Sequence, residues 1–290
     1  MYPSNFAYAA PTSLADALAQ MQAAGDDGKL LAGGQSLIPM LKLRLAEPGT
    51  LIDLGRVEGL RGIRVDGDNI VIGAMTPYYQ VLDSADVQRR CPLLIQTISQ
   101  VGDPQVRSRG TVGGSLAHAD PSGDLPAAAV ALDAKLTSTG PDGSHSYDAT
   151  SFFQDVMMTA LGPNEVLTSV SFPATDSPGT GTAYMKHRHP ASGYAVVGVA
   201  AIVTVGADGN CQSARIGITG AGSHATRATS TEQALAGKPL DAQSVAAACA
   251  TAADGVDLMG DAYASSDFRA HLIRVLAQRA ILQAAQNARR

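Results

Sequence analysis

The sequence predicts an α+β fold in which two N-terminal α/β subdomains are followed by a C-terminal α+β domain. Helix and strand patterns alternate in the first part of the 290-residue chain, and the hydrophobic period changes from 3.6 towards 2 near residue 57. A segment rich in Ser, Thr, Pro, Asp and Gly at residues 174–180 indicates a linker. We therefore expect three units, at residues 1–56, 57–176 and 177–290.

The first unit is expected to contain four elements. Ser13 is suited to cap a helix that ends at Gly25, and a short apolar strand follows at residues 29–32. A second helix begins near Leu37, and residues 51–54 have the composition of a strand.

The second unit is expected to combine hairpins with helices. Between two of its helices, residues 103–110 are expected to form a polar loop that carries two arginines. The remaining elements, in order, are a hairpin at 61–74, a helix from Thr76 and Pro77, a helix from Pro92 to Gly102, a helix at 127–134, a hairpin at 135–146, a short helix at 151–158 and a strand at 165–172.

The C-terminal unit is expected to be a three-stranded antiparallel sheet backed by helices, which can form a self-contained domain. The strands are expected at 183–187, 194–205 and 213–219, and the helices at 231–236, 242–253 and 267–288. In the last helix one flank is expected to lie along the sheet, and it is formed by Phe268, Leu272, Val275, Leu276, Arg279 and Leu282.

Two glycine motifs about eighty residues apart are the main functional signal. Ala32-Gly33-Gly34-Gln35-Ser36 and Thr111-Val112-Gly113-Gly114-Ser115 each place a glycine pair near a small hydroxyl residue. Glycine pairs allow positive φ and let successive amide groups converge on an anion, although one copy alone is ordinary turn chemistry. Two copies with the same layout indicate a ligand with two phosphates held from both sides. The P-loop and Rossmann patterns are absent from the sequence.

Several single residues have both a structural and a functional interpretation. Arg107 or Arg109 could reach a phosphate or remain solvated, and Asp124 could cap the helix behind it or accept hydrogen bonds from ligand hydroxyls. Tyr194 opens the most apolar strand and could lie beside a ligand ring or at an ordinary strand edge. His187 and His189 would share a strand face, but no further ligand at metal spacing accompanies them.

Composition argues against several classes of protein. The net charge of −5 argues against a nucleic-acid partner, because binding phosphates requires a basic surface. No apolar run is long enough to cross a bilayer, and the N-terminus lacks a secretory signal. The three cysteines, Cys91, Cys211 and Cys249, are far apart, which fits reduced thiols in the cytoplasm and gives no pattern for a metal or iron–sulfur site.

With both glycine motifs, the Asp-Pro-x-x-Asp-Leu-Pro turn at 120–126 and the helical run that begins at Phe268-Arg269, the chain resembles the FAD-binding medium subunit of the molybdenum hydroxylases. This is the family of xanthine dehydrogenase and aerobic carbon monoxide dehydrogenase. The resemblance runs from the first ten residues to the last helix. It implies a two-subdomain FAD-binding fold of the vanillyl-alcohol oxidase (PCMH/VAO) type, followed by a C-terminal flavoprotein domain.

The resemblance also implies a set of FAD-binding residues. The diphosphate would meet the amides of residues 32–37 and 111–115, Asp124 would contact the flavin, and Tyr194 would cover the isoalloxazine face. Leu161 and Leu167 would lie near the adenine end. The full set by matching position is Leu31, Ala32, Gly33, Gly34, Gln35, Ser36, Leu37, Val101, Thr111, Gly113, Gly114, Ser115, Asp124, Leu161, Leu167, Lys186 and Tyr194, with no catalytic and no metal-binding residue.

The function implied is electron transfer within a heterotrimer, itself expected to form a dimer of heterotrimers. An N-heterocycle, an aldehyde or a CO-like substrate would be oxidised on a large molybdopterin subunit. Two [2Fe–2S] clusters on a small subunit would pass electrons to FAD on this chain and then to an external acceptor. Two alternatives stay open, a stand-alone flavin-dependent reductase of the same fold and a flavin-free assembly scaffold.

Overall fold

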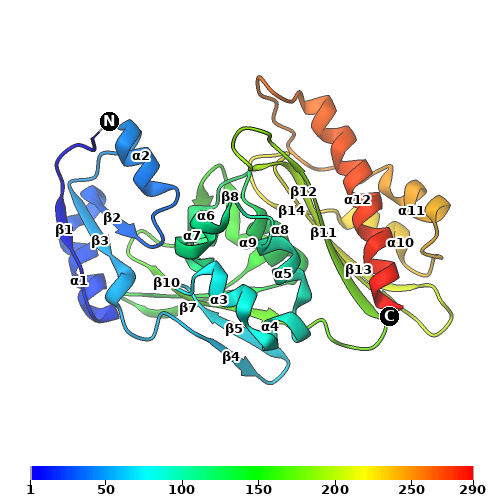
Figure 1. The fold of residues 1–290 in the computed structure, drawn as a ribbon, viewed down its shortest axis with the longest axis horizontal. Coiled ribbons are helices and arrows are strands. Elements are labelled where there is room, and N and C mark those ends of the chain that lie inside the picture. The colour runs from blue at the N-terminus through cyan, green and yellow to red at the C-terminus, as the bar shows by residue number, and fades with distance from the viewer. Residues whose placement is uncertain (1, 290) are drawn as a thin grey trace.

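The computed structural model describes residues 2–289 and arranges three main sheets one after another along the long axis of the molecule (Figure 1). The first sheet lies at the N-terminal end, the third at the C-terminal end, and the second between them.

The first sheet is parallel and has the strand order β1-β3-β2. Its unit consists of β1 (Ala7–Ala9), α1 (Leu14–Ala24), η1 (Gly25–Asp27), β2 (Gly28–Leu31), α2 (Leu37–Leu43), β3 (Thr50–Asp53) and η2 (Leu54–Arg56). Ser13 caps α1, because its hydroxyl accepts a hydrogen bond from the Asp16 amide at 3.1 Å. All four predicted elements are present, and β1 was not predicted.

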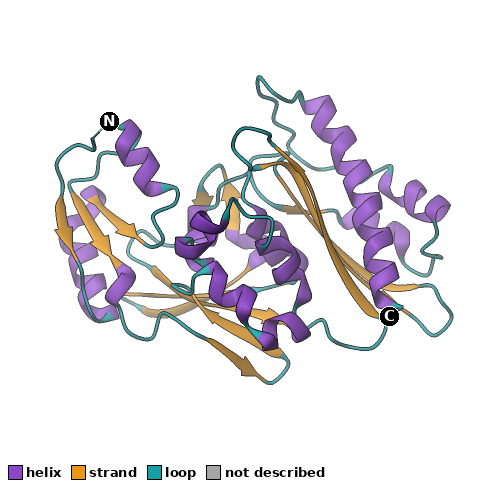
Figure 2. Ribbon diagram, in the orientation of Figure 1, coloured by secondary structure: helices purple, strands orange, loops and turns teal. Residues whose placement is uncertain are grey.

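The second sheet is antiparallel, in the order β4-β5-β10-β6-β7, and helices cover one of its faces (Figure 2). Its strands are β4 (Ile63–Asp66), β5 (Asn69–Gly73), β6 (Lys135–Gly140), β7 (Gly143–Asp148) and β10 (Val166–Pro173). The helices are α3 (Tyr78–Asp83), α4 (Ala85–Arg90), α5 (Pro92–Ile98), α6 (Pro104–Arg109), α7 (Val112–His118), α8 (Asp124–Ala131) and α9 (Ala149–Phe152).

Two predictions for this unit are wrong. Residues 104–109 form the helix α6 rather than a loop, because Asp103 caps it through the Val106 amide at 2.8 Å and Pro104 takes the first helical position. The predicted helix at 151–158 ends early at Phe152. A small hairpin of β8 (Phe153–Asp155) and β9 (Met158–Thr159) follows, and its turn holds Met157 at a φ of 53°.

The third sheet has four antiparallel strands, where three were predicted. The strands are β11 (Thr180–Arg188), β12 (Ala195–Val205), β13 (Cys211–Thr219) and the two-residue β14 (Thr226–Arg227), which is too short to leave a hydrophobic pattern. The helices are α10 (Thr229–Leu235), α11 (Ala242–Cys249) and α12 (Ser266–Ala288).

Helices cover the third sheet on both faces. α12 packs on β11 and β12 from the outside, and α8 of the second unit packs on β12 and β13 from the inside (Figure 1). Residues 195–203 of β12 are therefore buried without interruption. The predicted flank of α12 is only partly right. Leu276 is buried and Leu272 and Leu282 pack against the core, whereas Phe268 and Arg279 are exposed and the buried face is rich in alanine.

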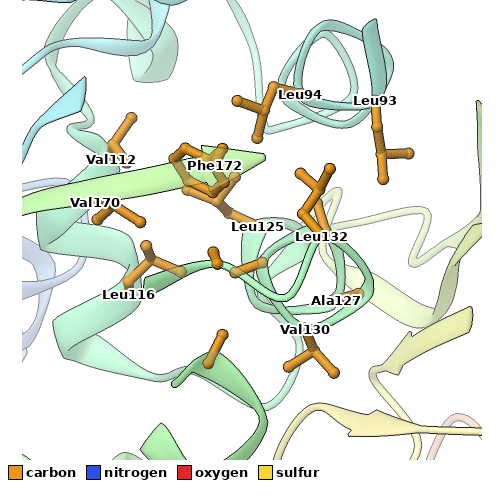
Figure 3. Close-up of a cluster of buried hydrophobic side chains, with 14 of the residues drawn as sticks. Leu93, Leu94, Val112, Leu116, Leu125, Ala127, Val130, Leu132, Val170 and Phe172 are labelled. Carbon is orange, nitrogen blue, oxygen red and sulfur yellow. The ribbon is translucent and has the colours of Figure 1, made fainter. Parts of the chain in front are cut away.

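The largest core lies between the second sheet and its helices. Figure 3 shows side chains from α5, α7, α8 and β10 pointing toward one another, among them Leu94, Leu116, Leu125 and Phe172. Tyr184, Ala200 and Ile202 of the third sheet belong to the same cluster, so this core continues into the C-terminal part of the chain.

We expect Gly217→Ala to destabilise the protein by about 1–3 kcal/mol, the usual cost of overpacking a tight contact. A Cβ at Gly217 would lie within 3.0 Å of the Ala127 backbone, so α8 and β13 would have to separate. Urea unfolding checks this, with Gly162→Ala as the control, because a Cβ there meets only the Glu165 side chain at 3.4 Å. Equal unfolding free energies for the two variants would contradict the prediction.

Candidate functional site

The first glycine motif forms the loop between β2 and α2, and its backbone amides are open. Gly34 has a φ of 74°, which favours glycine. Within residues 2–289, the amides of Gly33, Gly34, Gln35, Ser36 and Leu37 donate no hydrogen bond to another group of the protein. Five successive free donors ahead of a helix give a site at which an anion can bind.

The second glycine motif has a different conformation from the one predicted. Thr111 caps α7, and the motif forms the first turn of that helix, with neither glycine at positive φ. Its amides are already used: Val112 donates to the Thr76 carbonyl, Gly113 to Ala74, Gly114 to the Thr111 hydroxyl and Ser115 to the Thr111 carbonyl, at 2.8–3.1 Å. Glycine is needed here for close packing, because a Cβ at Gly113 would lie 2.7 Å from the Ala74 Cα.

The two motifs lie against each other although about eighty residues separate them. A Cβ at Gly33 would come within 2.9 Å of the Gly110 Cα, and a Cβ at Gly114 would lie 3.2 Å from the Ala32 side chain. Residues 32–33 therefore rest directly on residues 109–114, and the open amides of the first loop adjoin the N-terminal turn of α7.

Two tyrosines adjoin the hydroxyls of these motifs. Burial raises the pKa of the Tyr194 phenol and the charge of Asp120 raises it further, while the Ser36 hydroxyl lowers it through a side-chain hydrogen bond. Burial likewise raises the pKa of Tyr78, and the Ser115 hydroxyl opposes this. Tyr194 is 42% exposed and lines a hollow together with Asp120 and Ser122 of the second unit. Tyr78 was not predicted, because nothing near it in the sequence indicates the contact.

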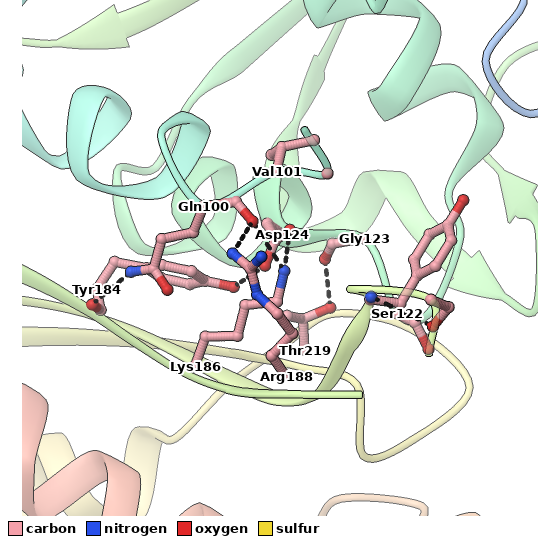
Figure 4. Close-up of polar contacts among 12 residues, drawn as sticks. Gln100, Val101, Ser122, Gly123, Asp124, Tyr184, Lys186, Arg188 and Thr219 are labelled. Carbon is pink, nitrogen blue, oxygen red and sulfur yellow. Dashed lines mark hydrogen bonds and ion pairs between the residues drawn. The ribbon is translucent and has the colours of Figure 1, made fainter. Parts of the chain in front are cut away.

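A buried polar cluster joins the start of α8 to β11 (Figure 4). Asp124 is only 5% exposed, and its carboxylate accepts hydrogen bonds from the Tyr184 hydroxyl at 2.6 Å and from Lys186 Nζ at 2.8 Å. Lys186 and Arg188 both donate to the Gln100 carbonyl. Burial raises the pKa of Asp124, and Lys186 and Tyr184 oppose this. Burial lowers the pKa of Lys186, and Asp124 opposes that shift.

The capping interpretation of Asp124 is wrong, since Gly123 is the cap residue of α8 and no side chain caps that helix. Tyr184, Lys186 and Arg188 alternate along β11 and therefore share one face. Tyr184 was missed in the sequence, although its spacing from Lys186 is a signal that could have revealed it.

The remaining candidates lie at the edges of this region. Arg107 donates to the Val101 carbonyl at 2.8 Å and so closes its own loop, while Arg109 is exposed. Leu167 is buried in the large core, and Leu161 packs against that core. His187 and His189 contact the rings of Phe268 and Tyr263, and no set of three metal-ligating side chains occurs among the described residues.

Glu165 fixes the end of the loop that carries Leu161. Its carboxylate accepts hydrogen bonds from Ser138 at 2.8 Å and Tyr147 at 2.7 Å, and it also bonds to His145. Burial alone would raise the pKa of Glu165, but the hydrogen bonds from Tyr147, His145 and Ser138 lower it to about 2.

Comparisons with known proteins cover nearly the whole chain. Residues 4–175 match the FAD-binding domain in molybdopterin dehydrogenase, and residues 182–284 match the CO dehydrogenase flavoprotein C-terminal domain. The medium chain of carbon monoxide dehydrogenase from Hydrogenophaga pseudoflava is 40% identical, over 97% of each chain. The alpha subunit of the 6-hydroxypseudooxynicotine dehydrogenase complex from Paenarthrobacter nicotinovorans is 35% identical, over 100% of this chain and 97% of that one.

Solved structures give the same result. Carbon monoxide dehydrogenase from H. pseudoflava superposes with a TM-score of 0.95 at 39% identity, over 99% of each chain. Quinoline 2-oxidoreductase from Pseudomonas putida 86 superposes with a TM-score of 0.93 at 33% identity, over 99% of each chain.

The fold and the paired glycine motifs thus define an FAD-binding component of an oxidoreductase. The chain belongs to the FAD-binding medium subunits of the molybdenum hydroxylases, the family that includes the medium chain of carbon monoxide dehydrogenase and the FAD-binding subunit of xanthine dehydrogenase. The predicted family is therefore confirmed. Among residues 2–289, no helix is both long and apolar enough to cross a membrane.

We expect Lys186→Met to cost about 3–5 kcal/mol of unfolding free energy, because the Asp124 carboxylate would be left buried without its cation. Adding Asp124→Asn should recover part of this loss, since an amide oxygen can still accept the Tyr184 hydrogen bond. The control is Lys135→Met, which breaks an ion pair whose side chains are both 65% exposed and should cost about 0–1 kcal/mol. Similar losses for the two lysine variants, measured by denaturant unfolding, would contradict the assignment.

Glu165 should make stability depend on pH in the acid range. Its folded pKa of about 2 is lower than the value of about 4.3 typical of an unfolded chain, so its contribution is complete above that value and is lost as the pH falls towards 2. The difference in unfolding free energy between the wild type and Glu165→Gln should therefore shrink over this range.

The matched control is Glu58→Gln, since Glu58 is exposed and its carboxylate makes no hydrogen bond within residues 2–289. The prediction would be overturned if the difference in unfolding free energy between the wild type and Glu165→Gln stayed constant from pH 5 to pH 2. It would also be overturned if that difference equalled the one for Glu58→Gln.

Proposed function

We propose that the open loop of the first motif binds the FAD diphosphate, with the second motif in a supporting role. The observation that carries this proposal is the run of free amides from Gly33 to Leu37. These amides could bind two phosphate groups without a bound cation. The Ser36 hydroxyl lies in that loop, and the Thr111 and Ser115 hydroxyls belong to the segment on which the loop rests, so these hydroxyls could donate as well. The amides from Val112 to Ser115 would take no part, because they already donate within the protein.

The other residues in this proposal divide by position. Leu31, Ala32 and the two glycines of the second motif shape the backbone of the cradle. Asp124, Lys186, Val101 and Tyr194 would orient the flavin, and Leu161 and Leu167 would lie near the adenine end. The bound FAD supplies the redox chemistry, and the residues of the chain bind it, orient it and set the charge around it.

We further propose that the chain works in a heterotrimer with a large molybdopterin subunit and a small subunit that carries two [2Fe–2S] clusters, assembled as a dimer of heterotrimers. The relatives are named medium chains or subunits of complexes, which supports this. Cys91, Cys211 and Cys249 are buried and separate, so the clusters would reside on a partner. Free cysteines also support a cytoplasmic location.

Substrate oxidation is proposed to occur on the large subunit, with electrons passing through the clusters to FAD on this chain and then to an external acceptor. The relatives act, by name, on carbon monoxide, glyceraldehyde, caffeine or 6-hydroxypseudooxynicotine. An N-heterocycle, an aldehyde or a CO-like molecule is therefore the proposed substrate class.

The unit boundaries 1–56, 57–176 and 177–290 remain our proposal for the domains. One main sheet falls within each unit, which supports the division.

The test compares Gly34→Ala with Gly67→Ala. Both glycines have positive φ, at 74° and 56°, so both variants carry a similar backbone strain of about 1–2 kcal/mol. Only Gly34 lies in the proposed cradle, so only Gly34→Ala should weaken FAD binding, by about 30-fold or more if one charge-assisted hydrogen bond of about 2 kcal/mol is lost.

Affinity is measured by titrating the purified apoprotein with FAD and following flavin fluorescence. Equal affinities for the two variants would refute the proposed cradle.

A further inference from the structure

The first turn of α12 holds a buried arginine that the FAD site does not use. Arg269 is 6% exposed, and its guanidinium donates to the Val196 carbonyl at 2.6 Å, to the Gly220 carbonyl and to the Asp261 carboxylate. It therefore joins the beginning of β12, the end of β13 and the segment before α12. Val196 is two residues beyond Tyr194.

Asp261 links Arg269 to an aromatic contact between Tyr263 and His189. Its carboxylate also accepts hydrogen bonds from the Tyr263 and Ala264 amides, both at 2.8 Å, so the turn that carries Tyr263 is fixed. The Tyr263 ring then packs on the His189 ring, with centroids 4.4 Å apart and planes inclined by 59°.

His189 organises the loop that ends at Tyr194. Its backbone amide donates to the Tyr194 carbonyl at 2.8 Å, and its own carbonyl accepts from Gly193 at 2.9 Å. Its Nδ1 lies 3.3 Å from the amides of Ala191 and Ser192 and accepts from them. The backbone and the imidazole of His189 therefore hold the loop in its conformation.

The loop spans a hollow rather than a packed core. A cavity of about 240 Å³ lies beneath it, lined by Ser122, His189, Ser192, Tyr194, Asp261 and Arg269 among others. Ala191, Ser192 and Tyr194 are exposed, so the position of the loop depends on the few contacts just described.

We infer that Tyr263 and His189, anchored by Asp261 and Arg269, are positioning residues that fix the loop ending at Tyr194, beside the point where the Ala195 amide donates to the Ser122 carbonyl of the second unit. Tyr194 is one of the residues proposed to contact FAD, so this inference rests on the proposed function. The Phe268-Arg269 pair in the sequence thereby gains a role, because Arg269 anchors the loop, while the Phe268 ring lies against the His187 ring.

The test uses the absence of tryptophan from the chain. Tyr194→Trp introduces a single tryptophan whose anisotropy and quenching by acrylamide report on the loop. Adding Tyr263→Leu removes one aromatic pair and should therefore increase the fraction of molecules with a displaced loop about 2- to 10-fold. The anisotropy of the tryptophan should then fall and its quenching should increase. Asp261→Asn should act in the same direction.

Phe268→Leu is the matched control, because Phe268 and Tyr263 are similarly exposed, at 41% and 46%, and both contact a histidine near the same loop. It should leave the tryptophan unchanged. Equal tryptophan anisotropy and quenching in the Tyr263→Leu and Phe268→Leu variants would overturn the inference.

The two proposals fail separately. Tryptophan mobility in the full-length apoprotein decides the positioning role whether or not FAD binds. Retention of FAD, read from the visible absorbance of the same samples, decides the cofactor proposal.

Discussion

The site depends on one contact between two backbones. The loop after β2 rests on the end of α6 and the start of α7 so closely that a Cβ at Gly33 would come within 2.9 Å of the Gly110 Cα. Only glycine permits that approach. The contact places the open amides of the first loop beside the N-terminal turn of α7, which is a distant segment of the chain.

The two motifs look alike in sequence but differ in their hydrogen bonds. The amides of the first motif are free to donate to a ligand, whereas the amides of the second motif donate to Ala74, Thr76 and Thr111. Because the amides of the second motif are hydrogen-bonded within the protein, that motif is a rigid support for a loop whose own amides are free. The Asp124–Lys186 pair joins the C-terminal domain to the second unit through buried charge.

Local signals in the sequence were sufficient to predict much of this arrangement. The open loop of the first glycine pair, the cap at Ser13 and most of the strands agree with the prediction, and the family followed from the motifs, but the second glycine pair forms a helix turn instead of an open loop. Errors arose where tertiary contacts decide. The flank of α12 was only partly predicted, because much of its buried face consists of alanine, which gives a weaker signal in the sequence than leucine. Tyr78 and Tyr184 were missed because their partners are distant in the sequence.

Amide hydrogen exchange, measured on the purified chain with and without FAD, tests the central claim most directly. The account predicts that the amides of residues 33–37 exchange rapidly in the apoprotein and become protected by FAD, because they have no other partner. The amides of residues 112–115 should already be protected before FAD is added. Protection of residues 33–37 in the apoprotein, or no change there on FAD binding, would contradict the account.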